Sequence, residues 1–112
     1  MFRATKGLGW KQRKMLAELA SNGGALPMSE LHARVPRAYD SIRRLWRRGV
    51  VIYVFRSRVE PEKWVAARYG APTDFSLSEA EMTAVANAEE EHVEGMYVIA
   101  EPYTKWAREN FS

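Results

Sequence analysis

The chain has 112 residues, of which 46% are hydrophobic and 12% aromatic, so it has enough apolar side chains to bury a core. It contains no cysteine and only two histidines, His32 and His92, which excludes disulfides and thiol catalysis and argues against a histidine-based metal site. The longest apolar run, 50–55, is too short to cross a bilayer and no signal peptide is recognisable, so we expect a cytoplasmic protein.

The net charge of +3 conceals a strong asymmetry along the chain. Residues 1–70 carry fifteen Lys and Arg against five Asp and Glu, a formal charge of +10. Residues 71–112 carry two against nine, a formal charge of −7. A basic segment of this density is typical of a surface that binds a polyanion, with the acidic segment as an appendage.

The first predicted elements are short and separated by clear breaks. Apolar residues at helical spacing predict a helix over 10–21, which Asn22-Gly23-Gly24 ends because glycine accepts the left-handed backbone that a helix end requires. Residues 25–28 are expected to be extended. Ser29 is a favourable N-cap for a second helix over 30–35.

A third helix is predicted between Pro36, which can open it, and Gly49, which closes it. Its apolar stripe consists of Ala38, Ile42, Leu45 and Trp46. The opposite face gathers Arg37, Asp40, Ser41, Arg44, Arg47 and Arg48, with Arg43 toward the flank. Because the connection at Pro36 is short, either Pro36 makes an abrupt corner or the second helix ends before Val35. The spacing of Trp10 and Trp46 favours a place in the core for both rings.

Two runs of β-forming residues, 50–55 and 64–69, predict strands joined by the basic loop 56–63. Alternation in the first run places Ile52 and Val54 on one face and Tyr53 and Phe55 on the other, and either pair fits the core.

The acidic segment begins after Gly70-Ala71-Pro72. The capping box at 78–81 predicts a helix that runs to 94, followed by a short strand over 96–100 and a helical end over 104–110. Its aromatic content is too high for a disordered tail, so it either folds back on the basic segment or pairs with a second copy. A further alternative is that it competes with nucleic acid for the basic surface.

The stretches "GGALPMSELHARV" and "IRRLWRRGVVIYV" belong to predicted elements in the order helix, strand, helix, helix, hairpin. Over about residues 8–70 these stretches and this order resemble the winged helix-turn-helix superfamily. The resemblance implies an α+β fold with three helices and a β-hairpin wing, with 1–70 as the winged domain and 71–112 as a helical and strand extension for packing or dimerisation. It also implies a duplex DNA-binding protein, a transcriptional regulator of bacterial, archaeal or phage type, whose third helix, 37–48, reads the major groove.

The expected contacts follow from this placement. Residues early on the exposed helix face are expected to reach base edges, later ones to reach phosphates, and basic residues in the first helix and the wing to clamp the backbone. The candidate DNA-binding residues are Lys11, Lys14, Arg37, Asp40, Ser41, Arg44, Arg47, Arg48, Arg56, Arg58 and Lys63, with Arg13 beside them.

No phosphate-binding glycine loop, acidic metal cluster or nucleophile–base pair is recognisable, so we expect no enzymatic activity, metal or cofactor. The partners expected are double-stranded DNA and a second copy of the chain, with no membrane. The alternative function is a protein-interaction module that docks on a polymerase or other nucleic-acid machinery, in which the acidic segment grips a basic partner.

Overall fold

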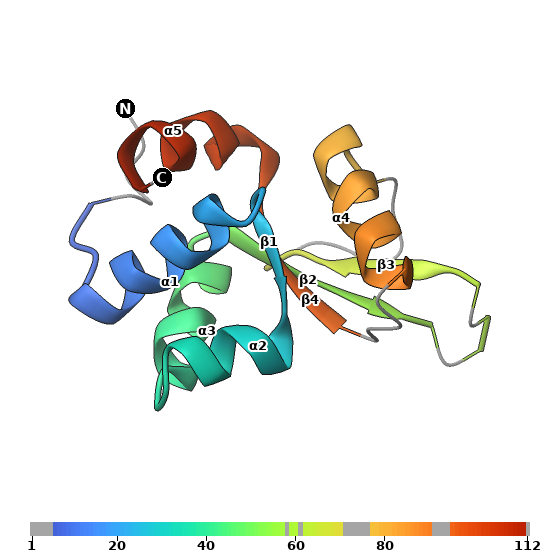
Figure 1. Ribbon diagram of the computed structural model, residues 1–112, viewed down its shortest axis with the longest axis horizontal. Helices are drawn as coiled ribbons and strands as arrows, with labels where there is room; N and C mark the ends of the chain where they lie inside the picture. Colours follow the sequence, from blue (N-terminus) through green and yellow to red (C-terminus); the bar gives the residue numbers. More distant parts are fainter. Residues whose placement is uncertain (1–5, 58, 61, 71–76, 91–94, 112) are drawn as a thin grey trace.

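The protein has an α+β fold, seen in a computed structural model that describes residues 6–57, 59–60, 62–70, 77–90 and 95–111 (Figure 1). In the basic segment the order of elements is helix, strand, helix, helix and β-hairpin, as predicted. The elements are α1 (Trp10–Ser21), β1 (Ala25–Pro27), α2 (Met28–Arg34), α3 (Tyr39–Arg47), β2 (Val51–Arg56), β3 (Trp64–Ala67), α4 (Glu79–Glu90), β4 (Gly95–Ile99) and α5 (Glu101–Phe111).

All four strands form one antiparallel sheet in the order β1-β4-β2-β3. Tyr53 of β2 lies opposite Ala67 on one side and opposite Tyr97 of β4 on the other. The acidic segment therefore supplies a central strand of the sheet. Of the two alternatives left by the sequence, it folds back on the basic segment of the same chain. The boundary predicted at residue 70 falls between strands that share this sheet.

The two faces of the sheet bury different side chains because residues alternate along each strand. Val51 and Ile99 point into a core formed with α1, α2, α3 and α5. Ile52 and Val54 point to the other face, where α4 packs. The sequence left open which pair of β2 side chains is buried. Ile52 and Val54 are fully buried, whereas Phe55 is 38% exposed. Figure 1 shows α4 set apart from the other four helices.

The end of α1 and the start of α4 follow local sequence, whereas the start of α2 does not. Gly23 and Gly24 both have positive φ, and the Gly24 N–H donates to Leu19 O, so α1 ends where predicted. Ser78 Oγ accepts from the Glu81 N–H at 3.2 Å and caps α4 as expected. The exception is Ser29, which lies inside the first turn of α2, because that helix already begins at Met28 after Pro27.

The predicted opening of α3 by Pro36 is wrong, since α3 begins at Tyr39. The backbone of Val35 is extended, as favoured before proline. Arg37 then adopts a left-handed conformation with φ 58°, which no helix start contains. Lys11 Nζ donates to the Arg37 carbonyl at 2.8 Å and holds this turn against α1. Arg37 therefore lies in the turn before α3.

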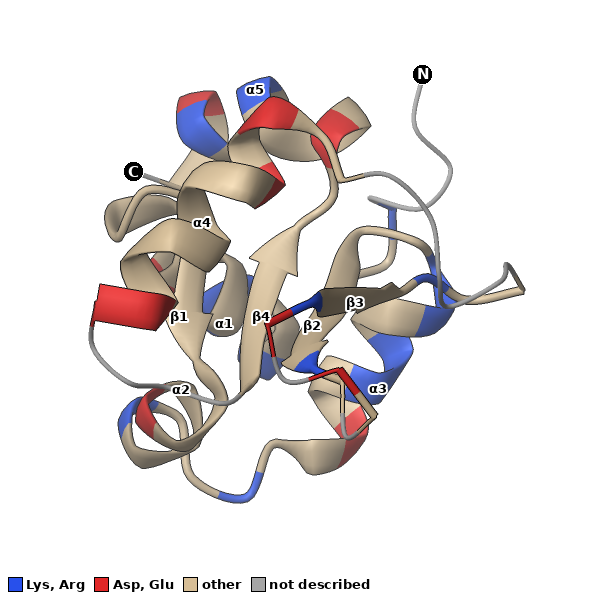
Figure 2. Cartoon of the chain, turned by 90° about the vertical axis from the view of Figure 1, so that its right-hand side faces the viewer, with Lys and Arg blue, Asp and Glu red and all other residues tan. Residues whose placement is uncertain are grey.

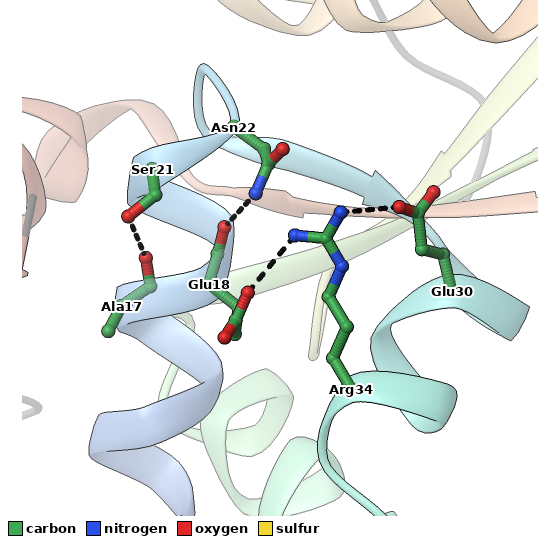
Figure 3. Close-up of polar contacts among 6 residues, drawn as sticks. All are labelled: Ala17, Glu18, Ser21, Asn22, Glu30 and Arg34. Atoms are coloured by element: carbon green, nitrogen blue, oxygen red, sulfur yellow. Dashed lines mark hydrogen bonds and ion pairs between the residues drawn. The ribbon is translucent and has the colours of Figure 1, made fainter.

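Glu18, Glu30 and Arg34 connect α1 to α2 (Figure 3). The Arg34 guanidinium donates to Glu18 Oε2 at 3.0 Å and to Glu30 Oε1 at 2.5 Å. The side chains are 31% to 43% exposed, so water screens these pairs and their main effect is to fix the angle between the helices. This angle positions the turn that leads into α3.

Candidate nucleic-acid interface

The open face of α3 consists of the side chains of this helix that are not buried in the core. Ile42 and Leu45 are fully buried, and Trp46 is half-buried. The exposed side chains are Asp40, Arg43, Arg44 and Arg47, with Tyr39 at the start of the helix. Ser41 and Arg48 are half-buried, so they lie at its margin instead of its centre. Arg43, which the sequence placed toward the flank, is fully part of the open face.

The α3 arginine group, defined as Arg43, Arg44 and Arg47, forms no ion pair with any residue in the described part of the chain. Each guanidinium consequently keeps its donors for an external acceptor. Figure 2 shows mainly blue segments on α3 with one red segment, whereas α4 carries red segments and α5 carries both colours. The charge asymmetry of the sequence is thus also an asymmetry in space.

The basic residues of α1 divide between two sides of the molecule. Lys11 lies beside Arg37, as its hydrogen bond to that residue requires, and both lie near the start of α3. Arg13 turns toward α5, with its guanidinium carbon 5.9 Å from the Phe111 ring centre. Lys14 is exposed on α1. Lys11 and Arg37 therefore extend the basic face of α3, whereas Arg13 does not.

Arg48 connects the end of α3 to the start of the described chain. Its Nη1 donates to the Lys6 carbonyl, 2.5 Å away. Arg48 therefore lies at the margin of the open face of α3, and one edge of its guanidinium group donates a hydrogen bond within the protein.

The hairpin loop does not continue the positive surface of α3. Arg56 reaches Glu89 of α4 at 3.5 Å and lies over the Trp64 ring, 5.0 Å from its centre. Lys63 Nζ pairs with Glu60 at 2.6 Å, and Glu62 is also exposed in the loop. Arg58 lies outside the described residues. The described part of the loop is therefore mixed in charge, and Arg56 and Lys63 each pair with a carboxylate.

A row of aromatic rings runs along the flank of α3 and was not predicted. The ring row, in order of contact, is Tyr39, His32, Tyr97, Tyr53, Trp46 and Tyr69. Consecutive ring centres are 4.0 to 5.4 Å apart, and Trp46 Nε1 donates to Ala67 O at 2.8 Å. The available signal was the seven-residue spacing of Tyr39 and Trp46, which places both on one side of a helix. Trp10 is 69% exposed, so its predicted place in the core is wrong.

His32 is the titratable group of this row. Its Nε2 and the Tyr97 hydroxyl share a 2.5 Å hydrogen bond, whose donor depends on the imidazole tautomer, and its buried Nδ1 has no hydrogen-bond partner among the described residues. Burial lowers the pKa of His32 from 6.5. Burial, followed by the neighbouring phenols of Tyr53 and Tyr39, raises the pKa of Tyr97 to about 12. Both shifts favour the neutral form of the group in the folded protein.

A pH dependence of stability follows from the lowered pKa of His32. Below pH 6.5 the unfolded chain binds a proton at this site more readily than the folded one, so the stabilisation present above 6.5 is lost as the pH falls through the folded pKa. Urea denaturation at a series of pH values is expected to show a shallower fall in the free energy of unfolding for His32→Phe than for the unchanged chain. Parallel curves for the two proteins would contradict the assignment.

Comparisons with known proteins add no further constraint: no family model, curated protein or solved structure matches this chain. Within the described ranges, no cluster of three or more carboxylate or imidazole side chains is close enough to hold a metal ion. The described helices all lack the length and apolar character that crossing a bilayer demands.

Proposed function

We propose that the protein binds duplex DNA with α3 in the major groove, as a transcriptional regulator of bacterial, archaeal or phage type. The observation that carries this proposal is the α3 arginine group, which is exposed and has no ion-pair partner among the described residues. A helix fits the major groove, where arginine donates two hydrogen bonds to guanine. Unpaired guanidinium groups on one helix face are also the usual means of neutralising phosphates.

The arrangement of elements also favours a winged helix-turn-helix. α2 and α3 are joined by a short turn, a buried stripe anchors α3, and a β-hairpin follows it. The main departure is β4, which lies between β1 and the hairpin. In this proposal Lys11 and Arg37 bind phosphates at the start of α3. The hairpin loop contributes less to DNA binding, because Arg56 and Lys63 already pair with carboxylates of the protein.

The salt dependence of duplex affinity tests the proposal. Each phosphate contact adds about 0.9 to the slope of log K against log salt concentration. Lys11, Arg37 and the α3 arginine group give a slope of about −4.5 when all five cations neutralise phosphates, and each guanidinium that binds a base edge instead reduces its magnitude by about 0.9. Fluorescence anisotropy with a labelled duplex at about 50 and about 200 mM salt measures it. No duplex binding, or binding that is insensitive to salt, would reject the proposal and favour the protein-docking alternative.

A further inference from the structure

Both ends of the ring row are open to solvent. Tyr39 is 68% exposed and Tyr69 is 55% exposed, although each contacts the next ring in the row. One face of Tyr39 stacks on His32, with ring centres 4.0 Å apart and planes 23° apart. An exposed fraction this high leaves the other face of the ring uncovered. The row therefore ends in aromatic surface that the protein does not use for its own packing.

The same flank of α3 carries positive charge. Arg43 follows Tyr39 by one helical turn, and Arg47 follows Arg43 by another. Both guanidinium groups also act on the Tyr53 hydroxyl in the middle of the row: burial raises its pKa, and Arg43 and Arg47 oppose that rise. Two cations with no ion-pair partner among the described residues thus lie beside the rings.

The sheet extends the aromatic surface beyond α3. Phe55 points to the same face as Tyr53, lies opposite Val65 of β3, and belongs to neither buried cluster. Its side chain is 38% exposed. The uncovered part of this face therefore lies between α3 and the far end of the hairpin.

Flat rings beside unpaired guanidinium groups match the chemistry of an unpaired nucleotide, whose base stacks on an aromatic face and whose phosphate accepts from arginine. Bases inside a duplex have no free face. An acidic peptide would use the cations and leave the rings unsatisfied. We propose that the ring row binds unpaired nucleotides adjoining the duplex held by α3, so that the protein prefers a junction between double and single strands. This extends the proposed duplex contact.

The test compares three probes with the full chain: a blunt duplex, the same duplex with a short thymine overhang, and the overhang strand alone. We expect the overhang to strengthen binding about tenfold over the blunt duplex. Tyr39→Ala/Tyr69→Ala is expected to abolish this gain, so that its affinities for the blunt and overhang probes become equal. The control Tyr39→Phe/Tyr69→Phe keeps the rings and is expected to retain the gain. A 2-aminopurine in the overhang reports stacking directly, because its fluorescence is quenched in the complex with the unchanged chain and not with the alanine variant.

The outcomes separate this inference from the duplex proposal. Equal affinity for blunt and overhang probes, or a gain that persists in the alanine variant, overturns the inference and leaves the duplex proposal in place. Binding of the single strand without the duplex overturns the junction preference and the duplex proposal together, and assigns the ring row to single strands alone. Sedimentation of the free protein as a dimer that the alanine substitutions dissociate would assign the rings to a contact between copies and overturn the inference.

Discussion

The variant Arg43→Ala/Arg44→Ala/Arg47→Ala is expected to bind duplex DNA about a hundredfold more weakly or worse. A well-placed arginine contact to a base contributes roughly 1–3 kcal/mol, and each 1.4 kcal/mol is a tenfold change in affinity. The three side chains form no ion pair with other described residues, so removing them is expected to leave the fold intact. Anisotropy titration at fixed salt measures the loss, and circular dichroism checks the helix content.

The matched control is Lys105→Ala/Arg108→Ala, which removes positive charge from the exposed side of α5. Net charge alone would make this variant lose affinity as well. If α3 makes the contacts, the control variant is expected to bind DNA with nearly unchanged affinity and with the same salt slope as the unchanged chain. If instead the triple variant matches the unchanged chain, the assignment of α3 as the DNA-contacting helix is wrong.

The acidic segment contacts a smaller part of the basic surface than the formal charges of the two segments suggest. Glu89 of α4 pairs with Arg56 at the base of the hairpin. The α3 arginine group has no such pair within the described ranges. Any competition between the acidic segment and nucleic acid would therefore act at the hairpin, where Glu89 pairs with Arg56, and not at α3. A duplex contact by α3 needs no displacement of α4.

Elements fixed by local sequence could be predicted. The apolar spacing of Ile42 and Leu45 and the glycine at position 49 fix the buried side and the end of α3. Gly23 and Gly24 likewise fix the end of α1. Each of these signals depends on residues within a turn or two of one another, where helical spacing and backbone conformation decide the outcome.

Features set by distant parts of the chain could not be predicted. The position of β4 between β1 and β2 depends on pairing between residues far apart in sequence, such as Tyr53 with Tyr97. The start of α3 depends on the left-handed backbone of Arg37, a conformation uncommon for arginine that Lys11 stabilises from α1. The ring row has the same origin, because it joins residues of α2, α3, β2 and β4.

The buried carboxylate of Glu81 gives the largest expected effect on stability. Glu81 is 0% exposed, although it lies in the exposed first turn of an acidic helix, and its Oε1 pairs with Arg68 just after β3. Ser78 Oγ also donates to Oε1 at 3.1 Å, whereas the buried Oε2 accepts no hydrogen bond from the described residues. The guanidinium of Arg68 is thus the cation that balances a charge removed from water.

Arg68→Ala is expected to lower the free energy of unfolding by about 3–5 kcal/mol, because it leaves this carboxylate buried without a counterion. Arg68→Ala/Glu81→Gln removes the charge as well and is expected to recover most of the loss. Arg34→Ala is the control, since it breaks ion pairs in which both side chains are partly exposed, and its effect is expected to be much smaller. Urea denaturation of the four proteins measures these differences. A loss for Arg68→Ala no greater than that for Arg34→Ala would show that α4 is held on the sheet by apolar packing alone, through residues such as Val85 and Ala88.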